Sequence, residues 1–107
     1  MAFYHLEDIQ AIPLVNGITI KAVYSEKSSV SFLDLPPFSR IPKHHHENEQ
    51  IGVVLEGEIE LTIDELKQTY HKGDRYFIPA GIPHSGKIYA GYADITFFNQ
   101  KDRYQTK

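Results

Sequence analysis

Three of the six histidines stand next to one another in the middle of the chain, in the segment PKHHHENEQ at residues 42–50. His44 and His46 have the same parity, so on an extended strand their imidazoles project to one face, about 7 Å apart. Gln50, four residues further on, also has an even number and is expected on the same face. Such nitrogen and oxygen donors on the concave side of a barrel can bind a divalent ion, and imidazole suits zinc, iron, nickel or copper. The alternative is a polar strand edge that carries surface histidines.

A further histidine follows a rigid turn. In the segment GDRYFIPAGIPH, residues 73–84, Gly73 opens a predicted strand, and prolines and a glycine come directly before His84. Proline fixes φ and glycine supplies positive φ, so the backbone sets the direction of the His84 side chain. The alternative is a tight corner with an incidental histidine.

Alternating apolar and polar residues predict strands on both sides of these histidines. The alternation is clear at residues 18–24, 58–63 and 94–97, and it is the mark of half-buried strands. Turn signals rich in glycine, proline and serine separate the runs. Many short strands in one small chain predict an all-β, antiparallel sandwich or barrel of the jelly-roll kind. A helical turn is expected only within residues 3–10.

Length and composition restrict the class of protein. A chain of 107 residues suits one domain, which we predict over residues 1–107. Cysteine is absent, so a metal would be bound by imidazole, amide or carboxylate. The net charge is −3 and the eleven Lys and Arg are scattered, which argues against a nucleic-acid or anionic-membrane surface. Without a signal peptide or an apolar run of membrane-spanning length, the expected location is the cytoplasm.

The two histidine segments resemble the two sequence motifs of the cupin superfamily. Residues 44–57 are similar to His-x-His-x3-Glu-x6-Gly, with Gln50 in place of the usual Glu, and residues 73–84 match Gly-x5-Pro-x-Gly-x2-His. The terminal Asn of the second motif is Ile88 here. The resemblance implies a double-stranded β-helix, the RmlC-like jelly roll or cupin barrel. It also implies one divalent transition metal ion, which leaves Zn, Ni, Mn, Fe and Cu open. The implied ligands are His44, His46, Gln50 and His84.

This ligand set resembles that of the pectin-degradation cupins, which convert 4,5-unsaturated uronates into open-chain keto sugars. The resemblance implies an isomerase- or lyase-like enzyme that processes a small carbohydrate-derived substrate. Replacing Glu by Gln leaves the metal with a higher net charge, which favours Lewis-acid over redox chemistry. The alternatives are a polyketide-cyclase-like cupin, a dioxygenase, a small-molecule binding cupin without turnover, and a purely structural domain.

The resemblance to the uronate group extends to the segment DITFFNQKDRY, residues 94–104. It implies that Asp94 transfers a proton and that Lys101, in place of an arginine, attracts a sugar carboxylate. The aspartate position of the group is Ile95 here, one residue from Asp94. A slip of one residue turns a strand side chain to the opposite face, unless a bulge restores it. The alternative is that Asp94 and Lys101 are exposed surface charges.

Aromatic side chains supply the remaining candidates. Tyr76 is a second candidate for the acid or base, because it faces away from Phe77 and its hydroxyl needs a partner if it is buried. Phe38 and Phe97 are candidate substrate contacts in the pocket wall. Most of the other phenylalanines and tyrosines are expected in the core.

A homodimer is expected because the chain resembles small cupins that pair through an edge strand or a sheet face. An open sheet edge tends to find a partner. The candidate edge is the segment that carries Ile18 and Ile20.

Overall fold

The computed structural model describes residues 5–14 and 18–100. Within these residues the chain forms one 3-10 turn, η1 (Leu6–Asp8), and ten β-strands. The strands are β1 (Ile12–Pro13), β2 (Thr19–Tyr24), β3 (Ser29–Leu35), β4 (Arg40–His44), β5 (Gln50–Glu56), β6 (Glu58–Ile63), β7 (Leu66–His71), β8 (Arg75–Ile78), β9 (His84–Lys87) and β10 (Tyr92–Phe98). The predicted strands at 18–24, 58–63 and 94–97 and the helical turn are therefore confirmed where they are described.

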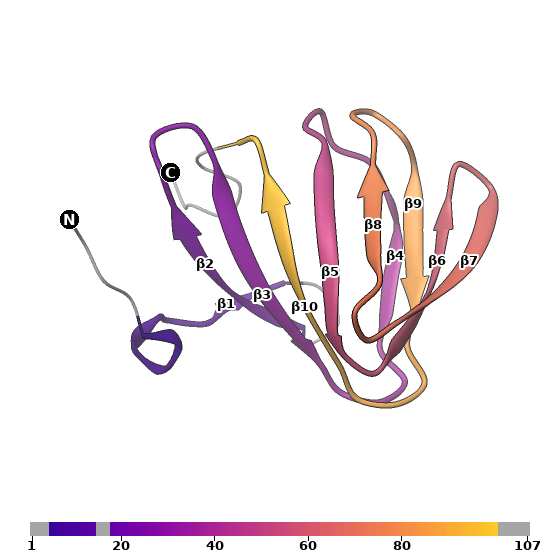
Figure 1. Ribbon diagram of the computed structural model, residues 1–107, viewed down its shortest axis with the longest axis horizontal. Helices are drawn as coiled ribbons and strands as arrows, with labels where there is room; N and C mark the ends of the chain where they lie inside the picture. The colour runs from indigo at the N-terminus through magenta and orange to yellow at the C-terminus, as the bar shows by residue number, and fades with distance from the viewer. Residues whose placement is uncertain (1–4, 15–17, 101–107) are drawn as a thin grey trace.

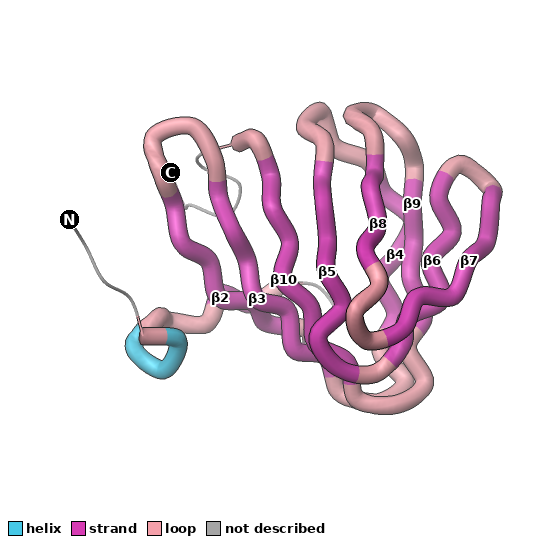
Figure 2. The backbone as a smooth tube through the Cα atoms, in the orientation of Figure 1, coloured by secondary structure: helices cyan, strands magenta, loops and turns pink. Residues whose placement is uncertain are grey.

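The strands form two antiparallel sheets. The larger sheet has the order β1-β2-β3-β10-β5-β8, and the smaller has the order β4-β9-β6-β7. Figure 1 shows β3, β10, β5 and β8 side by side, although β10 comes last in the chain. In Figure 2 the loops gather at the two ends of the strands. This is the jelly-roll arrangement that the sequence predicts. No helix in the described part of the chain has the length and apolar character needed to cross a membrane.

The core lies between the two sheets. Leu35, Val54 and Ile78 project into it from the larger sheet, and Ile59 and Leu61 project from the smaller one. All five are at most 4% exposed. In β6 this follows from the period-two pattern, because Glu58 and Glu60 alternate with the buried Ile59 and Leu61.

The edge of the larger sheet differs from the prediction. β1 pairs with β2 through Ile12 with Ile20 and Pro13 with Thr19, so β2 is covered there. Ile18 and Ile20 are 4% and 2% exposed and face the core. Their hydrophobic side chains are therefore buried within one chain, and the predicted homodimer stays a prediction.

Candidate metal centre

Three of the four predicted ligands converge at one end of the smaller sheet. His44 ends β4 and lies opposite His84, the first residue of β9. His46 lies in the loop after β4, and its carbonyl accepts a hydrogen bond of 2.8 Å from the backbone N–H of Gly81, in the turn before His84. Gly81 has φ +76°, as the predicted turn requires. The ligand atoms of the three histidines all lie within 4.8 Å of one another.

Each imidazole is held by a nearby backbone carbonyl. The contacts join Nδ1 to the carbonyl oxygen of a residue two positions away: His44 with Pro42 at 2.8 Å, His46 with Asn48 at 2.7 Å and His84 with Ile82 at 2.9 Å. A carbonyl only accepts hydrogen bonds, so in a neutral imidazole Nδ1 carries the hydrogen and Nε2 keeps its lone pair. A hydrogen bond of this kind fixes the ring orientation and tautomer of metal-binding histidines.

Gln50, the fourth predicted ligand, lies beside the triad. It begins β5, and its Oε1 lies 3.2 Å from Nε2 of His46. With the His46 hydrogen on Nδ1, these are two lone-pair-bearing atoms facing each other, which is unfavourable without a cation. Two donors around a single ion, each about 2.1 Å from it, adopt a separation of this size. The residues present therefore fit one divalent transition ion.

Asp94 faces the interior because it lies on the inward side of β10, together with Tyr92, Thr96 and Phe98. The pairing of β10 with β5 shifts register between Ala93, opposite Glu56, and Asp94, opposite Val54. Asp94 is 1% exposed. The reading of Asp94 as a surface charge is therefore wrong.

Two tyrosines bind the buried carboxylate. Tyr76 and Tyr92 donate hydrogen bonds of 2.9 Å and 2.6 Å to Oδ2 of Asp94. Burial raises the pKa of Asp94 to about 6, although the bonds from Tyr92 and Tyr76 lower it in part. Burial and the nearby Asp94 raise the pKa of both tyrosines. Both hydroxyls therefore stay protonated and act as donors.

Tyr76 reaches this position across Gly52. The two residues are opposite each other on β8 and β5, and a Cβ at Gly52 would overlap the Tyr76 ring. A glycine inside a strand often marks such a close approach. Gly52 and Tyr92 were not predicted from the sequence. The available signal for Gly52 was a glycine within an otherwise apolar strand.

A cavity of about 600 Å³ opens beside the histidines. His44, His84, Gln50 and Tyr76 line it, and Asp94 lies behind Tyr76. Most of the other lining residues are apolar, and none of the lining residues in the described part of the chain carries a carboxylate, ammonium or guanidinium group. The other lining residues are Pro13, Leu14, Ile18, Ser31, Leu33, Ile41, Pro42, Ile59, Leu61, Ile78, Ser85, Thr96 and Phe98.

Two predicted substrate contacts are wrong. Phe97 is 38% exposed and Phe38 is 79% exposed, and neither belongs to the cavity lining. The inward positions of β10 are occupied by Asp94, Thr96 and Phe98, so Phe97 points to the outer face. Lys101 lies outside the described residues.

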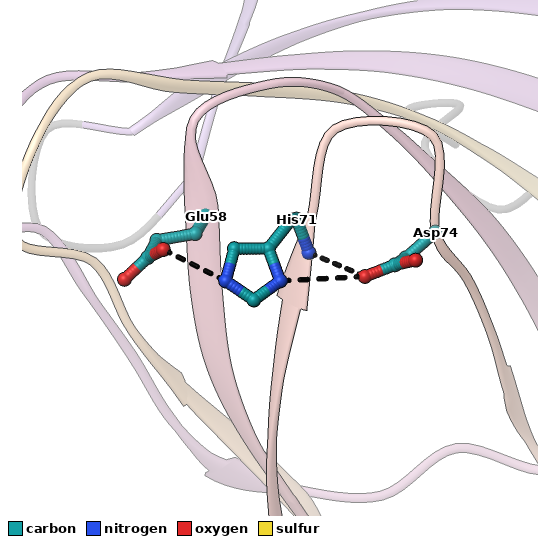
Figure 3. A network of polar contacts seen from close by, with 3 residues as sticks. All are labelled: Glu58, His71 and Asp74. Carbon is teal, nitrogen blue, oxygen red and sulfur yellow. Dashed lines mark hydrogen bonds and ion pairs between the residues drawn. The ribbon is translucent and has the colours of Figure 1, made fainter.

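A second group of ionisable side chains lies apart from the cavity. In Figure 3, His71 stands between Glu58 and Asp74, with Nε2 3.1 Å from Glu58 and Nδ1 3.6 Å from Asp74. The backbone N–H of His71 also donates to Asp74 at 2.8 Å. All three side chains are more than half exposed. Exposed ion pairs contribute little, so this group mainly closes the turn between β7 and β8.

The chain is a double-stranded β-helix, and a histidine triad that could hold a metal ion lies beside its cavity. The chain belongs to the cupin family, because the family model described as "Cupin domain" matches residues 31–90.

Two relatives with known names match part of the chain. The HTH-type transcriptional regulator PuuR of Escherichia coli (strain K12) is 57% identical over 42 residues, which cover 37% of this chain and 22% of the regulator. The H2HPP isomerase of Bacillus subtilis is 26% identical over 73 residues, which cover 67% of this chain and 31% of the isomerase. The chain thus spans less than a third of the length of either relative.

Solved structures match over nearly the whole chain. An RmlC-like cupin from Shewanella frigidimarina NCIMB 400 has a TM-score of 0.88 and 18% identity, covering 96% of this chain and 94% of the other. KdgF from Halomonas sp. has a TM-score of 0.83 and 19% identity, covering 95% and 96%. At these identities the likeness shows the fold.

Proposed function

We propose that the protein is a metal-dependent, non-redox cupin enzyme that moves a proton on a small substrate. One observation carries the proposal: three imidazoles with oriented Nε2 lone pairs and one amide oxygen meet beside an internal cavity. A divalent transition ion held there would polarise a substrate oxygen and so acidify the neighbouring C–H bond. The proposed ligands are His44, His46, Gln50 and His84.

We assign the proton transfer to Tyr76, supported by Asp94. Tyr76 lines the cavity, whereas Asp94 lies behind it and accepts a hydrogen bond from the Tyr76 hydroxyl. The Tyr76 oxygen accepts a proton from the substrate carbon while its own proton passes to Oδ2 of Asp94. The reverse transfer returns a proton to a different carbon, so the product is an isomer of the substrate. A carboxylate whose pKa is about 6 suits reversible transfer near neutral pH.

The cavity wall bears on the class of substrate. The unsaturated uronate predicted from the sequence is supported by the inward direction of Asp94. A uronate also carries a carboxylate and hydroxyl groups, and each costs free energy when it is buried without a partner. The described lining is mainly apolar and lacks cationic side chains. We therefore propose a substrate with an apolar body and one oxygen-bearing end that reaches the histidines.

A paired assay tests this proposal. Metal-loaded protein is incubated with a 4,5-unsaturated uronate, followed by loss of enol-ether absorbance, and separately with phenylpyruvate in D2O, followed by NMR. We expect metal-dependent hydrogen exchange at the carbon next to the phenylpyruvate carbonyl, above the rate in chelated protein. Turnover of the uronate alone would restore the sequence-based substrate class. Turnover of neither would contradict the enzymatic role.

A binding protein without turnover is the second candidate. The observation that favours it is the 57% identity over 42 residues to a transcriptional regulator. In that case a small molecule would raise the unfolding temperature of the metal-loaded protein and would be recovered unchanged.

The homodimer predicted from the sequence also remains a proposal, with a different contact surface. Phe97 of β10 is paired with Ile51 of β5, which is paired with Phe77 of β8. These three side chains are 38%, 43% and 52% exposed on the outer face of the larger sheet, and a second copy could cover this row. We expect light scattering to give twice the chain mass of 12.3 kDa. A mass near 12.3 kDa at micromolar concentration would contradict the dimer.

A further inference from the structure

We infer that Asp94 and Tyr76 form a positioning relay that holds the Gln50 amide with its oxygen, and not its nitrogen, toward the metal centre. The inference rests on the metal site of the proposed function. The Gln50 amide is neutral, with an oxygen acceptor and an NH2 donor at its two ends. A half-turn of this group would present the donor to the metal centre in place of the acceptor.

The direction of each hydrogen bond follows from the one before it. Oδ2 of Asp94 accepts from Tyr76 at 2.9 Å and from Tyr92 at 2.6 Å. A tyrosine hydroxyl has a single hydrogen, so the Tyr76 oxygen has only lone pairs left for Gln50. The amide must then donate, and its Nε2 lies 3.3 Å from that oxygen. This contact turns Oε1 toward Nε2 of His46, 3.2 Å away.

Protonation of the carboxylate does not reverse this order. Oδ1 of Asp94 is buried and makes no hydrogen bond to the described residues. A proton on Oδ1 therefore leaves Oδ2 free to accept from both tyrosines. The relay keeps its direction in both charge states of Asp94.

The fold brings the relay together from three adjacent strands. Asp94 lies on β10, Gln50 on β5 and Tyr76 on β8, and these strands neighbour one another in the order β10-β5-β8. Asp94 lies on the inward side of β10, and the missing side chain of Gly52 lets the Tyr76 ring lie over β5. Asp94 and Tyr76 are 1% and 6% exposed, so bulk water has little access to replace their hydrogen bond.

Two tyrosine variants separate positioning from general stability. Tyr76→Phe and Tyr92→Phe each remove one hydroxyl from a buried tyrosine and one hydrogen bond to the same carboxylate oxygen, but only Tyr76 contacts Gln50. We measure the Kd for Co²⁺ by competition with a chromophoric chelator and record the visible spectrum of the Co²⁺ protein. Tyr76→Phe should weaken binding about 10–100-fold and shift the spectrum, as expected when the partner of a metal ligand is lost. Tyr92→Phe should stay within about threefold of the wild type, because it leaves the Gln50 contact in place.

The same comparison in Gln50→Glu provides the second test. A carboxylate has two equivalent oxygens and needs no choice of end, so Tyr76→Phe in this background should change the Kd by less than about threefold. Equal losses for Tyr76→Phe and Tyr92→Phe, or the same loss in both backgrounds, would overturn the relay. A wild-type protein that binds no Co²⁺ would instead refute the proposed metal site, and the relay with it. Circular dichroism identifies any variant that fails to fold. In that case the comparison of Gln50→Glu with and without Tyr76→Phe decides whether the relay positions the amide.

Discussion

Replacing His84 with alanine is expected to abolish stoichiometric metal binding and substrate turnover together. The His84 imidazole supplies one of three Nε2 lone pairs in the triad, and its Nδ1 is already committed to the carbonyl of Ile82. Affinity and Lewis acidity depend on the same bond, so both should fall with its loss. Metal content after gel filtration and the two substrate assays measure the effect.

His71→Ala is the matched control for this variant. It removes the same side chain from the exposed group with Glu58 and Asp74 (Figure 3), away from the cavity lining. Metal content and turnover should stay at the wild-type level. If His84→Ala keeps its metal, or if both variants lose it equally, the triad is not the binding site.

Metal-free protein is expected to lose about 3 kcal/mol of stability as the pH rises through about 6, because of Asp94. The fold raises the pKa of this carboxyl from its ordinary 3.8 to about 6. A group with a raised pKa binds its proton more tightly in the fold, so its contribution is fully present below pH 3.8 and is lost as the pH rises through about 6. Above that pH the folded protein carries the cost of a buried charge.

Asp94→Asn isolates this effect, because the asparagine does not titrate. Urea unfolding in chelator from pH 4 to pH 8 gives the free energy of unfolding of both proteins. As the pH rises, the free energy of unfolding of the variant should increase by about 3 kcal/mol relative to that of the wild type. Contributions from the histidines are the same in both proteins and cancel. Parallel curves would show that Asp94 has an ordinary pKa.

In the metal-loaded protein the same variant, Asp94→Asn, should slow turnover about 10²–10⁴-fold, through loss of the proton acceptor.

The sequence predicts the triad and the fold well because both depend on local patterns. His44 and His46 are separated by one residue, and the turn through Gly81 directs His84, so short-range backbone geometry accounts for much of the triad. Alternation within single strands likewise suffices for the jelly roll.

The surroundings of the triad could not be predicted in the same way. Whether Asp94 or Phe97 faces inward depends on which side of β10 is turned to the core, and this is set by its pairing with β3 and β5, strands that lie far from it in the chain. A side-chain period of two makes every such assignment sensitive to one residue. The stacking of Tyr76 over Gly52 has the same origin, since it joins β8 to β5. The polarity of the cavity depends on which side of each of these strands faces inward, so it cannot be predicted from one strand alone.

The carbonyl contacts of the imidazoles also bear on how such a site changes during evolution. Each Nδ1 partner is a main-chain oxygen two residues away, at Pro42, Asn48 or Ile82, and no amino-acid substitution can delete a main-chain oxygen. Mutations at these partners alter the site only if they bend the backbone. The orientation of the triad is therefore robust to side-chain drift, whereas the relay through Asp94 and Tyr76 can be gained or lost by single substitutions. Proteins that diverge from this one should keep the imidazole geometry and vary first at the positions of Asp94 and Tyr76, which hold Gln50.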